Sequence, residues 1–96
     1  MAIGIVAKLK IQEGKNEEFE AIFNEMASAV TAQEPGNNFY ALHRSREDSS
    51  IYVVLEQYAD QAALDVHGKS DEFTAAAAKL GGCLGGKPEI EFLDGV

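Results

Sequence analysis

Apolar residues alternate with small or charged ones over positions 3–11. One face of this extended segment carries Ile3, Ile5, Ala7, Leu9 and Ile11, and the other face carries Gly4, Val6, Lys8 and Lys10. A period of two is typical of a β-strand with one face toward a core. The chain is therefore expected to open with a strand.

The hydrophobic period then becomes that of a helix. Gly14 breaks the strand, Asn16 is a suitable N-cap, and the acidic pair at 17 and 18 complements the helix dipole. The apolar positions that follow step by three and four, and they are Phe19, Ile22, Phe23, Met26, Ala29 and Val30. This pattern predicts a long helix with one buried face, which the run Glu34-Pro35-Gly36 ends.

A hairpin is predicted next. Residues Phe39–Ser45 form its first strand, Arg46–Ser49 its polar turn and Ile51–Tyr58 its second strand. The continuous apolar run at the start of the second strand favours a central position in the sheet.

The last third of the chain predicts two short helices and a strand. A helix opens at Asp60 and reaches Val66 or His67, and Ser70 caps a second helix. The buried side of that second helix carries Phe73, Ala76, Ala77 and Leu80. A glycine-rich connector over 81–86 leads to a final strand over 88–93.

This order of elements indicates an α+β, ferredoxin-like βαββαβ fold with an antiparallel sheet. At 96 residues the chain is expected to form one domain, 1–96. Helices would cover one face of the sheet and leave the other bare. A second copy is the expected cover, which predicts a homodimer.

The net charge argues against two classes of partner, and the cysteine content bears on the cellular compartment. The formal net charge is −8, a field that repels nucleic acid and anionic lipid surfaces, so neither nucleic acid nor membrane is expected as a partner. No segment approaches the roughly 18 apolar residues of a membrane span. The single cysteine permits no internal disulfide, which favours a reducing compartment, and the cytoplasm is the expected location.

His67 is the candidate catalytic base. A neutral imidazole titrates near physiological pH and, at a helix end that faces a pocket, would accept a proton from a phenolic hydroxyl. The same position also suits a structural role, in which the ring satisfies helix carbonyls and favours the dipole. Both readings stay open from the residues alone.

Glu56 and Tyr58 share one strand face, so one of them is placed to orient His67 while the other contacts the ligand. Alternatively, Glu56 only pairs with a cation and Tyr58 only packs. Tyr40 and His43 lie on opposite faces of the preceding strand, and the alternation does not say which face lines the pocket. Both stay candidates, and Phe73 is a candidate for the apolar wall or the core.

No metal site is predicted. The two histidines are far apart in sequence, with no recognised ligand spacing and no cysteine pair.

The run Ile51–His67, followed by Phe73, resembles the antibiotic biosynthesis monooxygenase domain, in particular its small quinol monooxygenase-like branch. Glu34-Pro35-Gly36 before Tyr40 and Leu42-His43-Arg44 extend the resemblance over nearly the whole chain. It implies a dimeric α/β barrel with a pocket between helices and sheet. Members that oxidise quinols use no metal or flavin, because a polar side chain deprotonates the substrate and the anion reacts with oxygen.

The resemblance implies a homodimeric, cofactor-independent monooxygenase acting on a quinol or related small polyphenol. His67 would be the base, and Tyr40, Glu56 and Tyr58 would shape the pocket. Haem degradation is disfavoured, because Ala7 and Ala77 stand where haem-degrading members carry functional residues. Two alternatives remain open: a non-catalytic dimeric binding module for a small hydrophobic metabolite, and a small isomerase in which His67 shuttles a proton without oxygen.

Overall fold

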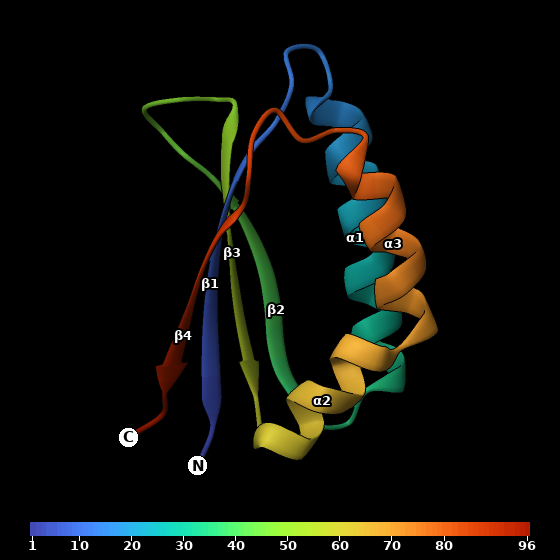
Figure 1. Cartoon of the computed structure of the whole chain (residues 1–96), viewed down its shortest axis with the longest axis vertical. Helices are drawn as coiled ribbons and strands as arrows, with labels where there is room; N and C mark the ends of the chain where they lie inside the picture. Colours follow the sequence, from blue (N-terminus) through green and yellow to red (C-terminus); the bar gives the residue numbers. More distant parts are fainter.

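A four-stranded antiparallel sheet and three helices make up the computed structural model, which describes residues 1–96 (Figure 1). In chain order the elements are β1 (Ile3–Lys10), α1 (Asn16–Gln33), β2 (Asn37–Arg44), β3 (Ile51–Tyr58), α2 (Gln61–Lys69), α3 (Asp71–Gly81) and β4 (Glu89–Asp94). The strand order is β2-β3-β1-β4, and every neighbouring pair is antiparallel. The predicted ferredoxin-like α+β fold is confirmed. The sheet of this single chain is open and does not close into a barrel.

All three helices lie on the same side of the sheet in Figure 1. Helices α1 and α3 run side by side, and α2 lies across the end of the molecule where β3 ends. This arrangement places the C-terminal part of α2 between the ends of the central strands and the start of α3. The two chain termini lie close together at that same end.

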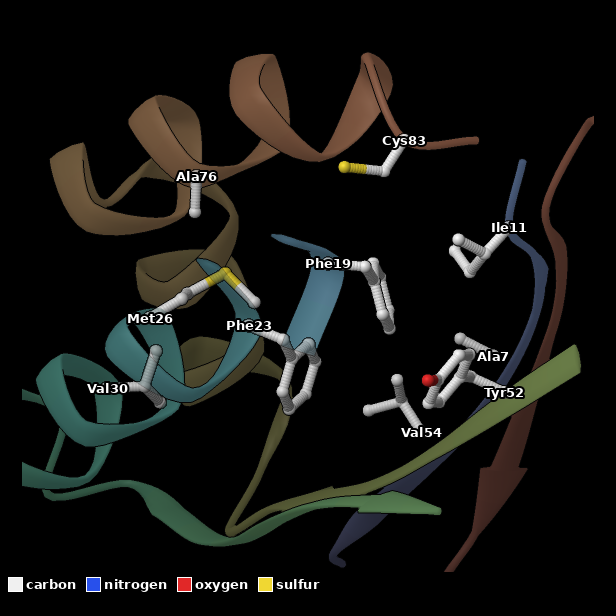
Figure 2. Close-up of a cluster of buried hydrophobic side chains, with 10 residues drawn as sticks. All are labelled: Ala7, Ile11, Phe19, Phe23, Met26, Val30, Tyr52, Val54, Ala76 and Cys83. Carbon is white, nitrogen blue, oxygen red and sulfur yellow. The ribbon is translucent and has the colours of Figure 1, made fainter. Parts of the chain in front are cut away.

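The core lies between the sheet and the pair α1 and α3 (Figure 2). Helix α1 buries one stripe of side chains, as its period predicts, and β3 buries alternate residues beneath it. The buried set is Ala7, Ile11, Phe19, Phe23, Met26, Val30, Tyr52, Val54, Ala76 and Cys83. Because side chains alternate along a strand, the even-numbered residues of β3 face the helices, and this face includes Glu56 and Tyr58.

The predicted helix start at Asp60 and the predicted cap at Ser70 are confirmed, and the predicted cap at Asn16 is wrong. The Asp60 side chain accepts a hydrogen bond from the Ala63 backbone N–H, and the Ser70 hydroxyl accepts one from the N–H of Phe73. Asn16, by contrast, is the first residue of α1, and its N-cap is Lys15, which provides no side-chain cap. The Asn16 amide instead donates to the Ser49 carbonyl at 2.7 Å, so this side chain ties α1 to the β2–β3 hairpin.

Among the remaining elements, one has its predicted boundaries and the others differ from theirs by a few residues. Strand β3 has the predicted bounds, α2 extends past His67 to Lys69, and β2 starts at Asn37. None of the three helices combines the length and apolar composition that crossing a membrane requires.

No helix covers the outer face of the sheet, which is the face opposite α1 and α3. This face carries a shallow groove beside the C-terminal residues, and its lining includes Val6, Phe39, Leu55 and Leu93. Strand β4 forms one edge of the sheet, and all six of its residues are exposed.

Candidate functional site

A cavity of about 320 Å³ lies between the sheet and the helices. Its wall takes residues from all four strands and all three helices, and 14 of its 18 lining residues are hydrophobic. The only lining side chains that ionise readily are those of Glu56 and His67. Its size is near the lower end for small-molecule sites, about 300 to 1,000 Å³. The cavity therefore suits a compact, largely apolar ligand with few polar contacts.

His67 lies at the centre of an aromatic cluster on the cavity wall. The Asp60 cap starts α2 so that its C-terminal turn carries this residue to the ends of the central strands. The ring centroid of His67 lies 5.5 Å from that of Tyr40, 5.1 Å from that of Tyr58 and 4.6 Å from that of Phe73. Residues from β2, β3 and α3 thus enclose the imidazole from several sides.

A carboxylate holds one nitrogen of that imidazole. Nδ1 of His67 lies 3.0 Å from Oε1 and 3.2 Å from Oε2 of Glu34, and each side chain is only 5% exposed. Glu34 follows α1 directly and precedes β2. The sequence predicts Glu34 only as part of the run that ends the helix. The one available signal was an acidic residue beside Pro-Gly where a helix ends, and no spacing rule links it to a histidine 33 residues later.

The other ring nitrogen, Nε2, has no hydrogen-bond partner in the protein. Every fully buried side-chain nitrogen or oxygen in the protein has a hydrogen-bond partner. Because Nε2 has none, it is not fully buried. Since His67 lines the cavity, its exposed nitrogen is available there to a ligand. The Tyr40 hydroxyl also has no hydrogen-bond partner in the protein and is not fully buried, and Tyr40 is one of the residues that line the cavity.

Glu56 is the second carboxyl group of the site. The Tyr58 hydroxyl donates a hydrogen bond of 3.0 Å to Oε1 of Glu56. Burial, opposed by the Tyr58 hydrogen bond and aided by the negative charge of Glu34, raises the pKa of Glu56 to about 7. A carboxyl group in this state exchanges a proton near neutral pH. Glu56 makes no hydrogen bond to His67, so the orienting partner is Glu34 and not a residue of β3.

Tyr40 stands directly opposite Glu56 in the β2–β3 ladder, on the face that the helices cover. Burial, with the charges of Glu56 and Glu34 adding to it, raises the pKa of the Tyr40 hydroxyl. Burial likewise raises the pKa of Tyr58, and the nearby charge of Glu56 raises it further. Both hydroxyl groups therefore stay protonated at neutral pH and can donate hydrogen bonds.

His43 is separate from this cluster. It pairs with Val53, is exposed and faces the outer side of the sheet, away from the cavity. The structure thus brings together Tyr40, Glu56, Tyr58, His67 and Phe73, adds Glu34, and leaves His43 outside. These six residues are called the site cluster below. Nowhere do three or more His, Cys, Asp or Glu side chains gather in a way that could hold a metal ion.

A family model described as antibiotic biosynthesis monooxygenase matches residues 2–79, a range that includes the whole site cluster. The protein YcnE of Bacillus subtilis (strain 168) is 30% identical over 77 residues, which is 80% of each chain.

Solved structures show the same architecture. A Caulobacter crescentus CB15 protein named for the same monooxygenase family is 47% identical and superposes with a TM-score of 0.97 over 99% of this chain and 90% of its own. SnoaB, a cofactor-independent oxygenase from Streptomyces nogalater, superposes with a TM-score of 0.85 over 98% of this chain and 92% of its own. At 23% identity, the likeness to SnoaB concerns the fold alone.

Proposed function

The chain belongs to the antibiotic biosynthesis monooxygenase family, and we propose on that premise that it is a cofactor-independent monooxygenase of a quinol or related small polyphenol. The observation that carries the proposal is the placement of His67. Its ring is fixed on one side by Glu34, is surrounded by aromatic side chains and has a free nitrogen at the wall of an apolar cavity.

In the proposed reaction, Nε2 of His67 accepts the proton of a substrate hydroxyl. The resulting anion is electron-rich and passes electrons to molecular oxygen, so the substrate itself is the reductant. One oxygen atom enters the ring and the other leaves as water. A quinol with a ring C–H and O₂ then give a hydroxyquinone and H₂O, which balances atoms and electrons.

The rest of the site cluster would orient the substrate. Tyr40 donates a hydrogen bond to one oxygen substituent of the substrate ring. Glu56, which holds a proton below about pH 7, donates a second hydrogen bond to the substrate. Phe73 packs against the His67 ring and supplies an apolar wall. Hydrophobic walls exclude water from the substrate anion, which strengthens these few polar contacts.

We also propose a homodimer, in which the outer face of the sheet of one copy packs on the outer face of the sheet of the other. Phe39, Leu55 and Leu93 are exposed there in the single chain, although they are large and apolar. Covering them would remove apolar surface from water and stabilise a small domain. We also place the reaction in the cytoplasm, because the one cysteine, Cys83, is a free thiol and suits a reducing compartment.

Oxygen uptake by the purified protein with a panel of quinols and polyphenols tests the proposal. The matched pair of variants is His67→Ala and His43→Ala, which alter the only two histidines. His67→Ala should lower turnover by about 10²- to 10⁴-fold, the contribution of a general base, and His43→Ala should leave it unchanged. Uptake no greater than autoxidation without protein would favour the binding module. Product formation without oxygen would favour the isomerase.

A further inference from the structure

Glu34 has no evident structural task at the end of α1. Its backbone N–H donates to the Val30 carbonyl and so closes the helix without help from the side chain. Its carboxylate is nevertheless buried, and its only hydrogen bonds go to Nδ1 of His67. A buried carboxylate is strongly destabilising unless it is paired, so this contact accounts for its placement.

The contact determines which nitrogen of His67 carries a proton. An ionised carboxylate can only accept hydrogen bonds, so the proton between the two side chains belongs to Nδ1. A neutral imidazole carries one proton, and Nε2 then holds a lone pair. We propose that Glu34 is a positioning residue, which locks His67 in the Nδ1–H tautomer with the basic Nε2 lone pair facing the cavity. This inference rests on the proposed function, since it assigns the orientation of the proposed base.

Glu34 would also stabilise the product of proton transfer. When Nε2 takes a proton the ring becomes a cation, and Glu34 lies against it at 3.0 Å. The other ionisable groups of the site cluster are Tyr40 on β2 and Glu56 and Tyr58 on β3, and no Lys or Arg side chain lines the cavity. The imidazolium therefore meets only neutral or negative groups, and Glu34 is the one in direct contact with it.

The backbone that carries Glu34 is held against α2 by a close approach. A Cβ atom built on Gly36 would lie 2.4 Å from Cβ of Ala63, so only glycine fits there without movement. The Gly36 carbonyl accepts a hydrogen bond of 2.8 Å from the N–H of Ala59, just before α2. Ala63 and His67 are one helical turn apart on the same face of α2. The segment 34–36 thus runs along that face, with Gly36 on Ala63 and Glu34 on His67.

Nuclear magnetic resonance of ¹⁵N-labelled protein tests the tautomer directly, because the chain has only two histidines. A neutral histidine in water favours the proton on Nε2, and the exposed His43 should show this ordinary tautomer. His67 should show the opposite one, with a protonated Nδ1 and an unprotonated Nε2. In Glu34→Gln, His67 should lose this preference while His43 is unchanged. An Nε2–H tautomer at His67 in the wild-type protein overturns the inference even if the variant fails to fold.

Kinetics supply the second readout. Glu34→Gln should lower kcat by about 10- to 100-fold with a smaller change in KM, and Glu34→Asp should recover part of the loss, since it keeps the carboxylate. A folded Glu34→Gln protein with wild-type kcat and an unchanged His67 tautomer overturns the inference. If the wild-type protein turns over no substrate, the proposed function fails, and the tautomer measurement alone still decides the role of Glu34.

Discussion

The Tyr58 hydroxyl donates a hydrogen bond to the Glu56 carboxylate two residues earlier on the same face of β3, 3.0 Å away and in the protein interior. This hydrogen bond favours the ionised form of Glu56, whereas burial of the carboxyl group disfavours that form. Burial has the larger effect, and Glu56 therefore titrates near neutral pH. Stability and pocket chemistry should both change over the same pH range.

Glu56→Gln should remove a pH dependence of stability. The folded-state pKa of about 7 exceeds the ordinary value of 4.5, so the folded protein binds more protons than the unfolded chain between these pH values. The contribution of Glu56 to the free energy of unfolding is present below pH 4.5 and lost as pH rises toward 7, by up to about 3 kcal/mol. Urea unfolding of both proteins at pH 5 and pH 8 measures this. An equal fall in stability for both proteins would assign the pH dependence to other groups.

Tyr58→Phe should raise the pKa of Glu56 further, because it removes the hydrogen bond that lowers it. The ionised carboxylate then lacks its partner, which should cost about 1 to 3 kcal/mol at pH 8 and less at pH 5. The double variant with Glu56→Gln serves as the control, since the phenylalanine should cost less when no carboxylate is present. Additive losses would mean that the hydroxyl contributes nothing through Glu56.

Gly36→Ala should destabilise the protein by about 1 to 3 kcal/mol, because the new methyl group overlaps Ala63 and pushes the 34–36 segment away from α2. Turnover should fall with it, since Glu34 moves with that segment. Gly81→Ala is the matched control, because a Cβ at Gly81 meets nothing within 4 Å. Thermal unfolding and oxygen uptake of both variants provide the comparison. A Gly36→Ala protein as stable and active as Gly81→Ala would show that the close approach is dispensable.

Leu55→Glu should convert the proposed dimer into a monomer. Leu55 lies in the groove on the outer face of the sheet, and a buried, unpaired carboxylate there would oppose association. Val66→Glu introduces the same charge at an exposed position of α2 that does not line this groove, and it should leave the dimer intact. Sedimentation velocity at micromolar concentration distinguishes the two states. A monomeric wild-type protein, or a dimeric Leu55→Glu protein, contradicts the predicted interface.

Cys83 should not react with thiol reagents while the protein is folded. Its side chain is buried in the core, and burial raises the pKa of the thiol, so little thiolate is present or accessible (Figure 2). An aromatic disulfide reagent should modify it at the rate of unfolding, and rapidly in urea. Fast modification of the native protein would indicate local opening around the end of α3.

Local patterns in the sequence predict much of this fold. The change from a period of two to steps of three and four predicts β1 and α1, and polar side chains at Asp60 and Ser70 predict two helix starts. These features depend on residues close together in the chain. Asn16 misleads because Ser49, far away in sequence, competes for its amide.

The site is harder to predict because its contacts join distant segments. Each face of strand β2 carries both polar and apolar residues, so its pattern does not show which face is buried. The choice between Tyr40 and His43 therefore depends on where the helices pack. The partner of His67 lies 33 residues earlier, and no periodicity relates the two. Only the folded backbone brings Glu34 to the imidazole.

Strand β4 leaves the sheet with an unpaired edge. Three of its six residues, Glu89, Glu91 and Asp94, are acidic, and they alternate in part with the apolar pair Ile90 and Phe92. At neutral pH, these charges repel the same edge of another molecule and so prevent the sheet from extending between molecules. That protection weakens as the pH falls toward the pI of 4.6, where the chain as a whole carries no net charge. Acidification should therefore make the same strand the place where aggregation begins.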